Sequence, residues 1–211
     1  MKKIIFIILV CFASCTPIND AVIFNNEINQ EPVKEVRTKS VIRSEWMIDD
    51  FNKKNRNSLK GNVNPWAFNP KDVNQICKTK YSKAVRQGNK GFSLQIIYDV
   101  DSPSQAFNGI YSELNNADFS PYNNLVFWIK GDQGKGFTST FKVELKNSNN
   151  QTGTYYVQGV TEEWQKVVIP FSQFKGISDF TSMKEFTVVF VDSEVTQKEG
   201  VLYMDDLSVT Q

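Results

Sequence analysis

Alternating hydrophobic and polar residues run through most of the chain beyond residue 45. In residues 141–146, Phe, Val and Leu alternate with Lys, Glu and Lys, so the two sets point to opposite faces of an extended backbone. Residues 186–190 and 203–209 repeat this period of two. Such a period is typical of β-strands with one buried face, and turn residues separate the runs. Long amphipathic helical patterns are missing from the sequence.

The same pattern sets the expected elements and the fold class. Residues 171–174 and 178–183 are expected to form single helical turns. About ten strands without the spacing of β-α-β units predict an all-β, two-sheet β-sandwich of the jelly-roll type. We expect one such domain over residues 45–211. The predicted strands are 46–51, 75–81, 91–100, 107–114, 124–130, 138–146, 152–160, 164–169, 184–191 and 201–210.

The N-terminal segment differs from the rest. Lys2 and Lys3 precede an apolar run, residues 4–12, which is far shorter than the roughly 20 residues that span a bilayer. Small residues and a cysteine, Ala13-Ser14-Cys15, follow. This order predicts a signal peptide over residues 1–14. Its ending resembles a bacterial lipobox, which implies lipidation of Cys15; a plain secretory signal cut near Ser14 is the alternative.

Residues 15–44 are polar, contain few aromatic residues and lack a sustained period, which predicts a flexible tether behind the lipidated cysteine. Acyl chains on Cys15 would hold the domain at a membrane. The expected location is therefore the cell envelope. Thr16, rather than Asp, after the cysteine is compatible with the outer membrane or the cell surface.

Composition removes several function classes. The formal net charge is +1, and without the two lysines of the signal peptide 22 basic residues face 23 acidic ones, so no basic field for nucleic acid is evident. Histidine is absent, which excludes Ser-His-Asp and Cys-His catalysis and His-ligated zinc. Cys77 is the one cysteine of the expected domain, and we interpret it as a core or sheet thiol.

Four segments in order resemble one fold family. They are IDDF at 48–51, YNNLVFWIKGD at 122–132, EWQKVVIPF at 163–171 and YMDDL at 203–207. Together they are similar to the galactose-binding-like jelly rolls, in particular the glucan-binding modules beside bacterial endoglucanases and the domain of the mitochondrial complex I intermediate-associated protein. The resemblance implies a carbohydrate-binding domain, with a protein-interaction or assembly scaffold as the alternative.

Two aspartate pairs are the candidate metal ligands. Asp49 and Asp50 open the domain, and Asp205 and Asp206 lie in its last strand. The terminal strands of a jelly roll can be neighbours, and carboxylates brought together repel unless a cation joins them. Oxygen ligands favour Ca²⁺, and the resemblance implies a structural Ca²⁺ between these strands. Adjacent residues point to opposite faces, so we expect one ligand from each pair. Alternatively, the aspartates cap strand ends.

Outward aromatic and polar side chains are the candidate glycan ligands. A tyrosine ring offers an apolar platform to the C–H face of a pyranose, while neighbouring polar groups bind its hydroxyls. Tyrosine is also an ordinary strand residue, and a tryptophan near a loop either stacks on a sugar or plugs the core. A glycosidase acid and nucleophile pair would need a cleft, which the aspartates alone do not predict. The favoured function is non-catalytic glycan binding, with the ligand residues Tyr111, Tyr156, Gln158, Lys142, Glu144, Glu113 and Trp66.

Overall fold

The structure, a computed structural model, describes residues 44–211. The predicted signal peptide, the lipidated Cys15 and all of the predicted tether except Ser44 lie outside these residues. Within the described range, no helix has the length and apolar character needed to cross a membrane.

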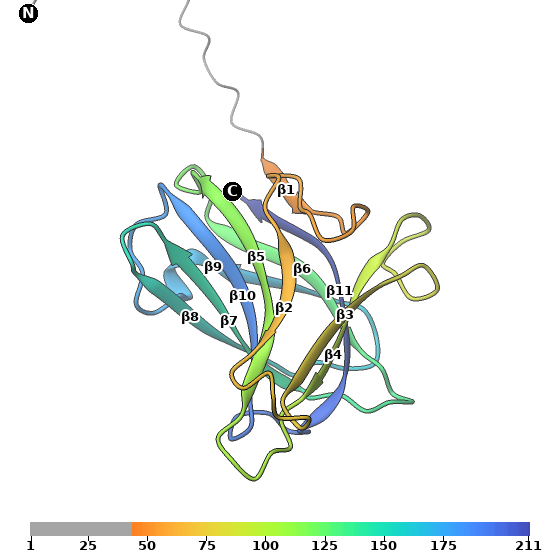
Figure 1. Ribbon diagram of the computed structural model, residues 1–211. Coiled ribbons are helices and arrows are strands. Elements are labelled where there is room, and N and C mark those ends of the chain that lie inside the picture. The colour runs from red at the N-terminus through yellow and green to blue at the C-terminus, as the bar shows by residue number, and fades with distance from the viewer. Residues whose placement is uncertain (1–43) are drawn as a thin grey trace, which may run out of the picture. The chain divides into compact units, whose positions relative to one another are not determined.

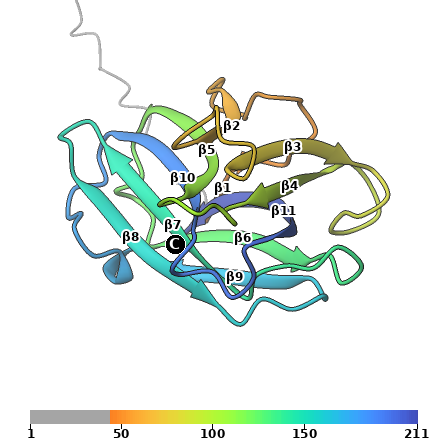
Figure 2. The ribbon, with the colours of Figure 1, turned by 60° about the horizontal axis from the view of Figure 1, so that its bottom comes forward.

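Two antiparallel sheets stack face to face (Figures 1 and 2). The five-stranded sheet, called the β5 sheet below, contains in spatial order β2 (Val63–Ala67), β5 (Phe107–Ala117), β10 (Met183–Val191), β7 (Thr140–Asn147) and β8 (Thr152–Gln158). The six-stranded β11 sheet contains β3 (Ile76–Ser82), β4 (Ser93–Asp99), β11 (Glu199–Thr210), β6 (Asn124–Gly131) and β9 (Gln165–Pro170), and β1 (Glu45–Asp49) pairs with the second half of β11.

Alternation along the strands builds the core between the two sheets. In β7 every second residue is buried, and the same holds for most of β4 and β6. The inward rings of Phe127 and Phe186 lie 6.2 Å apart across the interface, and Tyr98 stacks on Phe190 at 4.1 Å. Most of the buried hydrophobic side chains form one cluster that draws on both sheets. This arrangement confirms the two-sheet sandwich that the period of two predicts.

Two elements differ from the sequence expectation. Residues 63–67 form β2, a strand that is absent from the sequence prediction. Pro65 lacks the amide hydrogen that a residue of an inner strand donates. The strand is tolerated because β2 is an edge strand, paired on one side with β5. Residues 178–182 form no helical turn and lead directly into β10, whereas Phe171–Gln173 do form a short 3₁₀ helix, η1.

The last strand holds the β11 sheet together. The first half of β11 pairs with β4 and its second half with β1, while β6 runs along the other edge. The register against β6 shifts between Asp205 and Ser208, and Asp206 has a φ of 48° there. A bulge of this kind turns side chains away from strict alternation. It lies where β1 takes over from β4, beside the aspartates of both terminal strands.

Candidate functional site

The outward side of the β5 sheet gathers the predicted ligand residues. Cross-strand partners share a face of a sheet, and the register pairs Asn64 with Tyr111, Thr187 with Tyr111, and Thr187 with Glu144. A second row of cross-strand pairs on the same face joins Trp66 with Gly109 and Lys142 with Tyr156. We call this surface the β5 face; its side chains are Asn64, Trp66, Phe107, Tyr111, Glu113, Lys142, Glu144, Lys146, Thr154, Tyr156, Gln158, Glu185 and Thr187.

A shallow hollow lies on this face beside Trp66. Its volume is about 260 Å³, and it is lined by Trp66, Tyr111, Lys146, Glu185 and Thr187. Tyr111 Oη accepts a hydrogen bond of 3.2 Å from Asn64 Nδ2. The structure therefore places Trp66 on the outer face, with an aromatic platform and charged groups in one depression.

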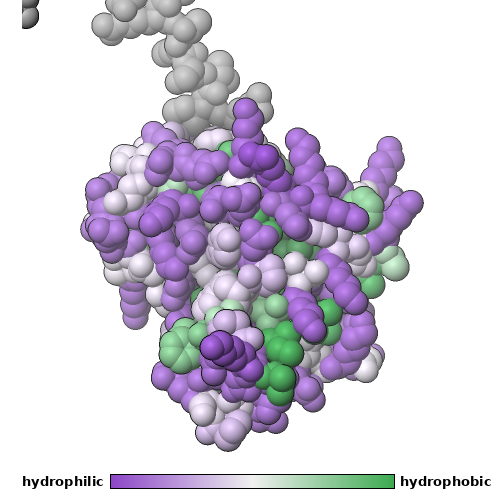
Figure 3. Space-filling model, in the orientation of Figure 1, coloured by the Kyte–Doolittle hydropathy of each residue, from purple (hydrophilic) through white to green (hydrophobic). Residues whose placement is uncertain are grey.

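Aromatic rings continue from Trp66 toward the end of β2. The rings of Phe107 and Trp66 meet edge to face at 6.0 Å, and Phe68 stacks on Phe107 at 4.3 Å. Phe68 is 56 % exposed, and it is one of four large hydrophobic side chains exposed within residues 44–211. Figure 3 shows a mostly hydrophilic surface, with hydrophobic residues visible in the lower centre of the view and at its right edge.

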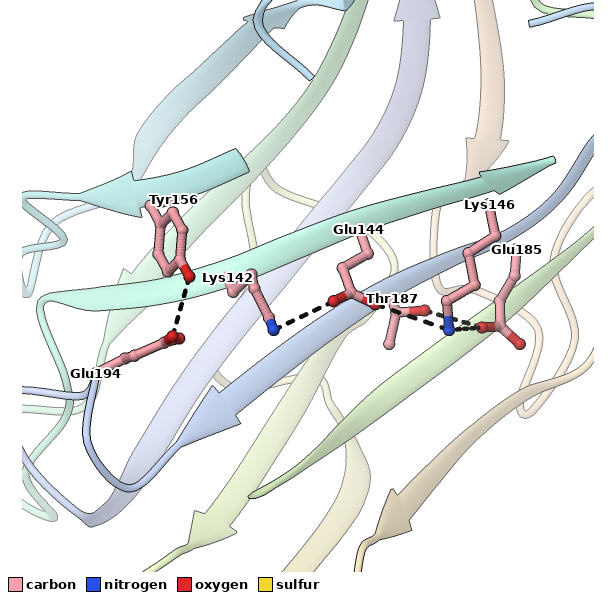
Figure 4. A network of polar contacts seen from close by, with 7 residues as sticks. All are labelled: Lys142, Glu144, Lys146, Tyr156, Glu185, Thr187 and Glu194. Atoms are coloured by element: carbon pink, nitrogen blue, oxygen red, sulfur yellow. Dashed lines mark hydrogen bonds and ion pairs between the residues drawn. The ribbon is translucent and has the colours of Figure 1, made fainter. Parts of the chain in front are cut away.

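A chain of ion pairs occupies the middle of the β5 face (Figure 4). Lys142 Nζ lies 3.2 Å from Glu144, and Lys146 Nζ lies 3.7 Å from Glu144 and 2.8 Å from Glu185. Thr187 donates a hydrogen bond of 3.0 Å to the same Glu185 oxygen. These charges alternate in sign along the row. The network therefore presents fixed donors and acceptors to the solvent without a strong net field.

Tyr156 and Glu194 extend the polar row to the β8 edge of the same face (Figure 4). Tyr156 Oη donates a hydrogen bond of 2.9 Å to Glu194 Oε1, and the ring is 44 % exposed. This bond to a carboxylate raises the pKa of the Tyr156 phenol, so it stays protonated. Gln158 is exposed near the end of the same strand. Glu113 accepts hydrogen bonds from the backbone and side chain of Asn62.

The structure thus brings all seven predicted ligand residues to one face. It also adds residues that the sequence reasoning missed: Asn64, Phe68, Phe107, Lys146, Glu185, Thr187 and Glu194. Lys146 continues the alternation of Lys142 and Glu144, so that signal was present. Phe68 lies in an expected loop and Glu194 in the turn after β10, where alternation carries no information.

Asp49 ends β1 and Asp50 follows it directly, while Asp205 and Asp206 lie in the neighbouring strand β11. Asp49 and Asp205 are buried, with 2 % and 3 % exposure, whereas Asp50 is exposed and Asp206 is half-buried. Asp49 Oδ1 accepts a hydrogen bond of 2.8 Å from the Phe51 N–H. Asp205 accepts bonds from the backbone N–H groups of Gln87 and Asp206. We call these four aspartates the carboxylate cluster.

Burial dominates the electrostatics of this cluster. It raises the pKa of the Asp49 carboxyl to about 7, opposed by the Phe51 N–H and reinforced by the charges of Asp50 and Asp205. Burial also raises the pKa of Asp205 to about 7, again against a backbone N–H, that of Gln87. The pKa of Asp206 is raised by burial and by Asp50. Within residues 44–211, no lysine or arginine forms an ion pair with the four carboxylates.

The donor atoms of the carboxylate cluster are of the type that a hard cation prefers. All of its groups are oxygens, and Asp49 Oδ2 is buried without a hydrogen-bond partner among the described residues. In the same range, no three acidic or cysteine side chains stand close enough together to hold a metal by themselves. A cation here would therefore need backbone carbonyl or water oxygens in addition to Asp49 and Asp205, which is ordinary for Ca²⁺.

The chain is similar in sequence to one family of known proteins. The sequence pattern of the family described as carbohydrate binding domain 30 matches residues 58–211. No curated protein sequence matches the chain.

Solved structures resemble the whole sandwich. The family 11 carbohydrate-binding module of the cellulosomal cellulase Lic26A-Cel5E of Clostridium thermocellum has a TM-score of 0.61 at 16 % identity, over 80 % of this chain and 95 % of that one. The family 11 module from Clostridium thermocellum in complex with a β-1,3-1,4-mixed-linked tetrasaccharide has a TM-score of 0.60 at 18 % sequence identity. The match covers 79 % of this chain and 95 % of that one. A structure of an exo-β-agarase has a TM-score of 0.55 at 11 % sequence identity, and the match covers 78 % of this chain and 24 % of that one. These likenesses confirm the predicted jelly-roll fold.

Proposed function

This chain belongs to the carbohydrate binding domain 30 family, and we propose that it is a non-catalytic module that binds a polysaccharide or glycan on the β5 face. The observation that carries the proposal is the hollow where Trp66 and Tyr111 meet Lys146 and Glu185. Rings that stack on sugar C–H groups and polar tips that bind hydroxyls are the two things pyranose recognition needs.

The face is largely pre-formed for such a ligand. The ion pairs of Lys142, Glu144 and Lys146 hold their own side chains in place, so little side-chain entropy is lost on binding. Covering one or two sugar rings at about 25 cal/mol per Å² stabilises the complex by only a few kcal/mol. We therefore expect dissociation constants of roughly millimolar to micromolar, which several sites or tethering to a surface would strengthen.

The choice of the first ligand to test comes from the relatives. The family 11 module that superposes on this chain was solved with a β-1,3-1,4-mixed-linked tetrasaccharide. The charges of the β5 face are paired within the network, which suits a neutral chain of this kind. A mixed-linked β-glucan is therefore the first probe.

The proposal also places the domain at the cell envelope. The basic start, the short apolar run and the small residues before Cys15 support export and lipid anchoring, and residues 15–44 would then serve as the tether. A lipid anchor would hold many copies in one plane, which compensates for weak single-site binding. Labelling of the whole protein with a palmitate analogue in its native cell tests this part, and loss of label in Cys15→Ala would support it.

A structural Ca²⁺ at the carboxylate cluster is the last part of the proposal. Asp49 and Asp205 would contribute side-chain oxygens, with Asp50 and Asp206 nearby. The ion would supply the positive charge that these buried carboxylates lack within residues 44–211. Its role would be to lock β1 against β11, away from the glycan.

Calorimetric titration of the protein with mixed-linked β-glucan tests the function. Tyr111→Ala and Tyr156→Ala should each weaken binding about threefold to tenfold, because each removes a stacking surface. Val168→Ala is the control, because Val168 is a 50 % exposed side chain of β9, in the other sheet. Unchanged affinity in both tyrosine variants would show that the site lies elsewhere. If the protein binds no glycan, the protein-interaction alternative becomes the leading function.

A further inference from the structure

An irregularity in β5 opens a second hollow near the β5 face. Glu113 pairs with Glu185 and Ala117 with Met183, so three residues of β5 stand opposite Lys184 alone. Within this bulge, Asn115 and Asn116 both have left-handed backbones, with φ of 50° and 59°. Asparagine tolerates this conformation better than most residues. Bulges and left-handed residues are common next to binding sites, where they redirect side chains.

The bulge leaves a depression of about 430 Å³. Glu113, Asn115, Asn116, Ser148 and Lys184 line it, and no aromatic or aliphatic side chain is among them. One cation and one carboxylate make the lining neutral overall. A ligand there would be held by hydrogen bonds to several donors and acceptors, which is the chemistry of a neutral polyhydroxylated sugar.

Neighbouring segments fix the walls of this depression. Asn115 Nδ2 donates a hydrogen bond of 2.9 Å to the Leu59 carbonyl, and Ser148 Oγ donates one of 2.7 Å to Asn116 Oδ1. Ser148 is in turn bonded to Ser182. These bonds leave Asn115 Oδ1 and Asn116 Nδ2 without partners among the described residues. The wall is thus held in place while one acceptor and one donor stay available.

The depression is next to the hollow beside Trp66. Glu113 borders the depression, and its cross-strand partner Glu185 lines the Trp66 hollow. Tyr111 and Asn115 are four residues apart on β5, so their Cα atoms are at most about 13 Å apart at roughly 3.3 Å per residue. The two hollows share no lining residue, and their volumes are about 260 and 430 Å³. A glycan that fills both hollows must contain several sugar units.

We propose that the Asn115–Asn116 bulge forms a second, polar subsite that binds the hydroxyls of a sugar unit in a neutral glycan whose other end stacks on Trp66 and Tyr111. This inference rests on the proposed function and adds to it a requirement for chain length. The Trp66 hollow supplies stacking, and the bulge hollow supplies hydrogen bonds at a fixed distance from it.

Titration with a β-1,3-1,4-mixed-linked tetrasaccharide and with its disaccharide fragment tests the subsite. Asn116→Gly keeps the left-handed backbone while removing the amide, and Lys184→Ala removes the cation. Each should weaken tetrasaccharide binding about threefold to tenfold and disaccharide binding less than twofold. Asn55→Gly is the matched control, because Asn55 also has a positive φ, of 58°, and lies outside the hollow.

The outcomes separate the two proposals. Wild-type tetrasaccharide affinity in both Asn116→Gly and Lys184→Ala, together with weakened binding in Trp66→Ala, would overturn the subsite and leave the proposed function standing. Equal losses for disaccharide and tetrasaccharide would also overturn it. A wild-type protein that binds neither these oligosaccharides nor any other glycan would overturn the proposed function and the subsite with it.

Discussion

Two groups of carboxylates in this molecule have opposite surroundings. On the β5 face, Glu144 and Glu185 lie on the outer side of the sheet, with 17 % and 23 % of their side chains exposed, and share the ammonium group of Lys146. In the carboxylate cluster, Asp49 and Asp205 are buried, have no cationic partner within residues 44–211, and have pKa values raised to about 7. The first group has a cation beside it. The second is stable only with a proton or a bound cation.

The difference shows which region is arranged for recognition and which for stability. Surface ion pairs contribute little to folding, about 0–1 kcal/mol each, but they hold polar side chains ready for a ligand. Buried carboxylates without a counter-charge destabilise the fold when ionised, by an amount that a cation would recover. The four predictions below test this contrast, in order of decreasing expected effect.

The largest expected effect is on the stability of the fold, and it comes from the buried charge of Asp49. With a chelator present, the wild-type protein should be more stable at pH 5 than at pH 8. The folded pKa of about 7 exceeds the unfolded value near 3.8, so the folded state binds more protons between these values. The stability gained by this proton is therefore lost as the pH rises toward 7. Between pH 5 and pH 8 we expect this carboxyl to lower the free energy of unfolding by about 2–3 kcal/mol, which lowers Tm by about 5–10 °C.

Asp49→Asn supplies the comparison, because the amide does not titrate and keeps the oxygen that accepts from Phe51. Its Tm should fall less than that of the wild type between pH 5 and pH 8. The lowered pKa values of Asp72, Asp132 and Asp179 act in the opposite direction in both proteins, and so cancel. Added Ca²⁺ should raise the Tm at pH 8 in the wild type only. Identical pH profiles in the two proteins would contradict the assignment.

Truncation of Trp66 should have the next largest effect, on binding rather than on stability. Trp66→Ala removes the largest ring of the Trp66 hollow, and affinity for mixed-linked β-glucan should fall tenfold or more, about 1.4 kcal/mol or above. Calorimetric titration measures the affinity, and melting shows that the fold remains. Trp164→Ala is the matched control, since Trp164 precedes β9 in the other sheet. Equal losses in both variants would indicate a general effect on folding.

A smaller effect on glycan affinity is expected when Lys146, the cation that Glu144 and Glu185 share, is replaced. Lys146→Met leaves Glu144 and Glu185 without the ammonium that joins them, so glycan affinity should fall about threefold as the network loosens. Stability should change by less than about 1 kcal/mol, because the pairs are at the surface. Titration and urea unfolding measure the two quantities. A stability loss of several kcal/mol would mean that the network belongs to the fold rather than to recognition.

The smallest effect should follow from Tyr156→Phe. The ring remains for stacking, and only the hydrogen bond to Glu194 is lost, so affinity should fall less than threefold. Tyr156→Ala, which also loses the ring, should bind more weakly than Tyr156→Phe in the same titration. If the two variants bind equally, the hydroxyl and not the ring contacts the glycan.

Much of the site could be predicted because the side-chain period of a strand is local. The alternation of Lys142 and Glu144 with buried neighbours, and the adjacency of Tyr155 and Tyr156, are visible without any knowledge of the partner strands. Phe68 and Glu194 could not be predicted in this way. They lie in turns, where no period constrains direction, and their places follow from the pairing of β2 with β5 and from the turn after β10.

The sequence by itself determined every strand except β2, the inward and outward faces of these strands, and the resemblance to galactose-binding-like jelly rolls, because these depend on neighbouring residues and on ordered motifs. The tertiary structure decided which strands lie side by side. Only the register of β2, β5, β10, β7 and β8 gathers Trp66, Tyr111 and Tyr156 on one face, and only the pairing of β1 with β11 buries Asp49 near Asp205. Sheet order and register depend on contacts between residues far apart in the chain, and no local pattern records them.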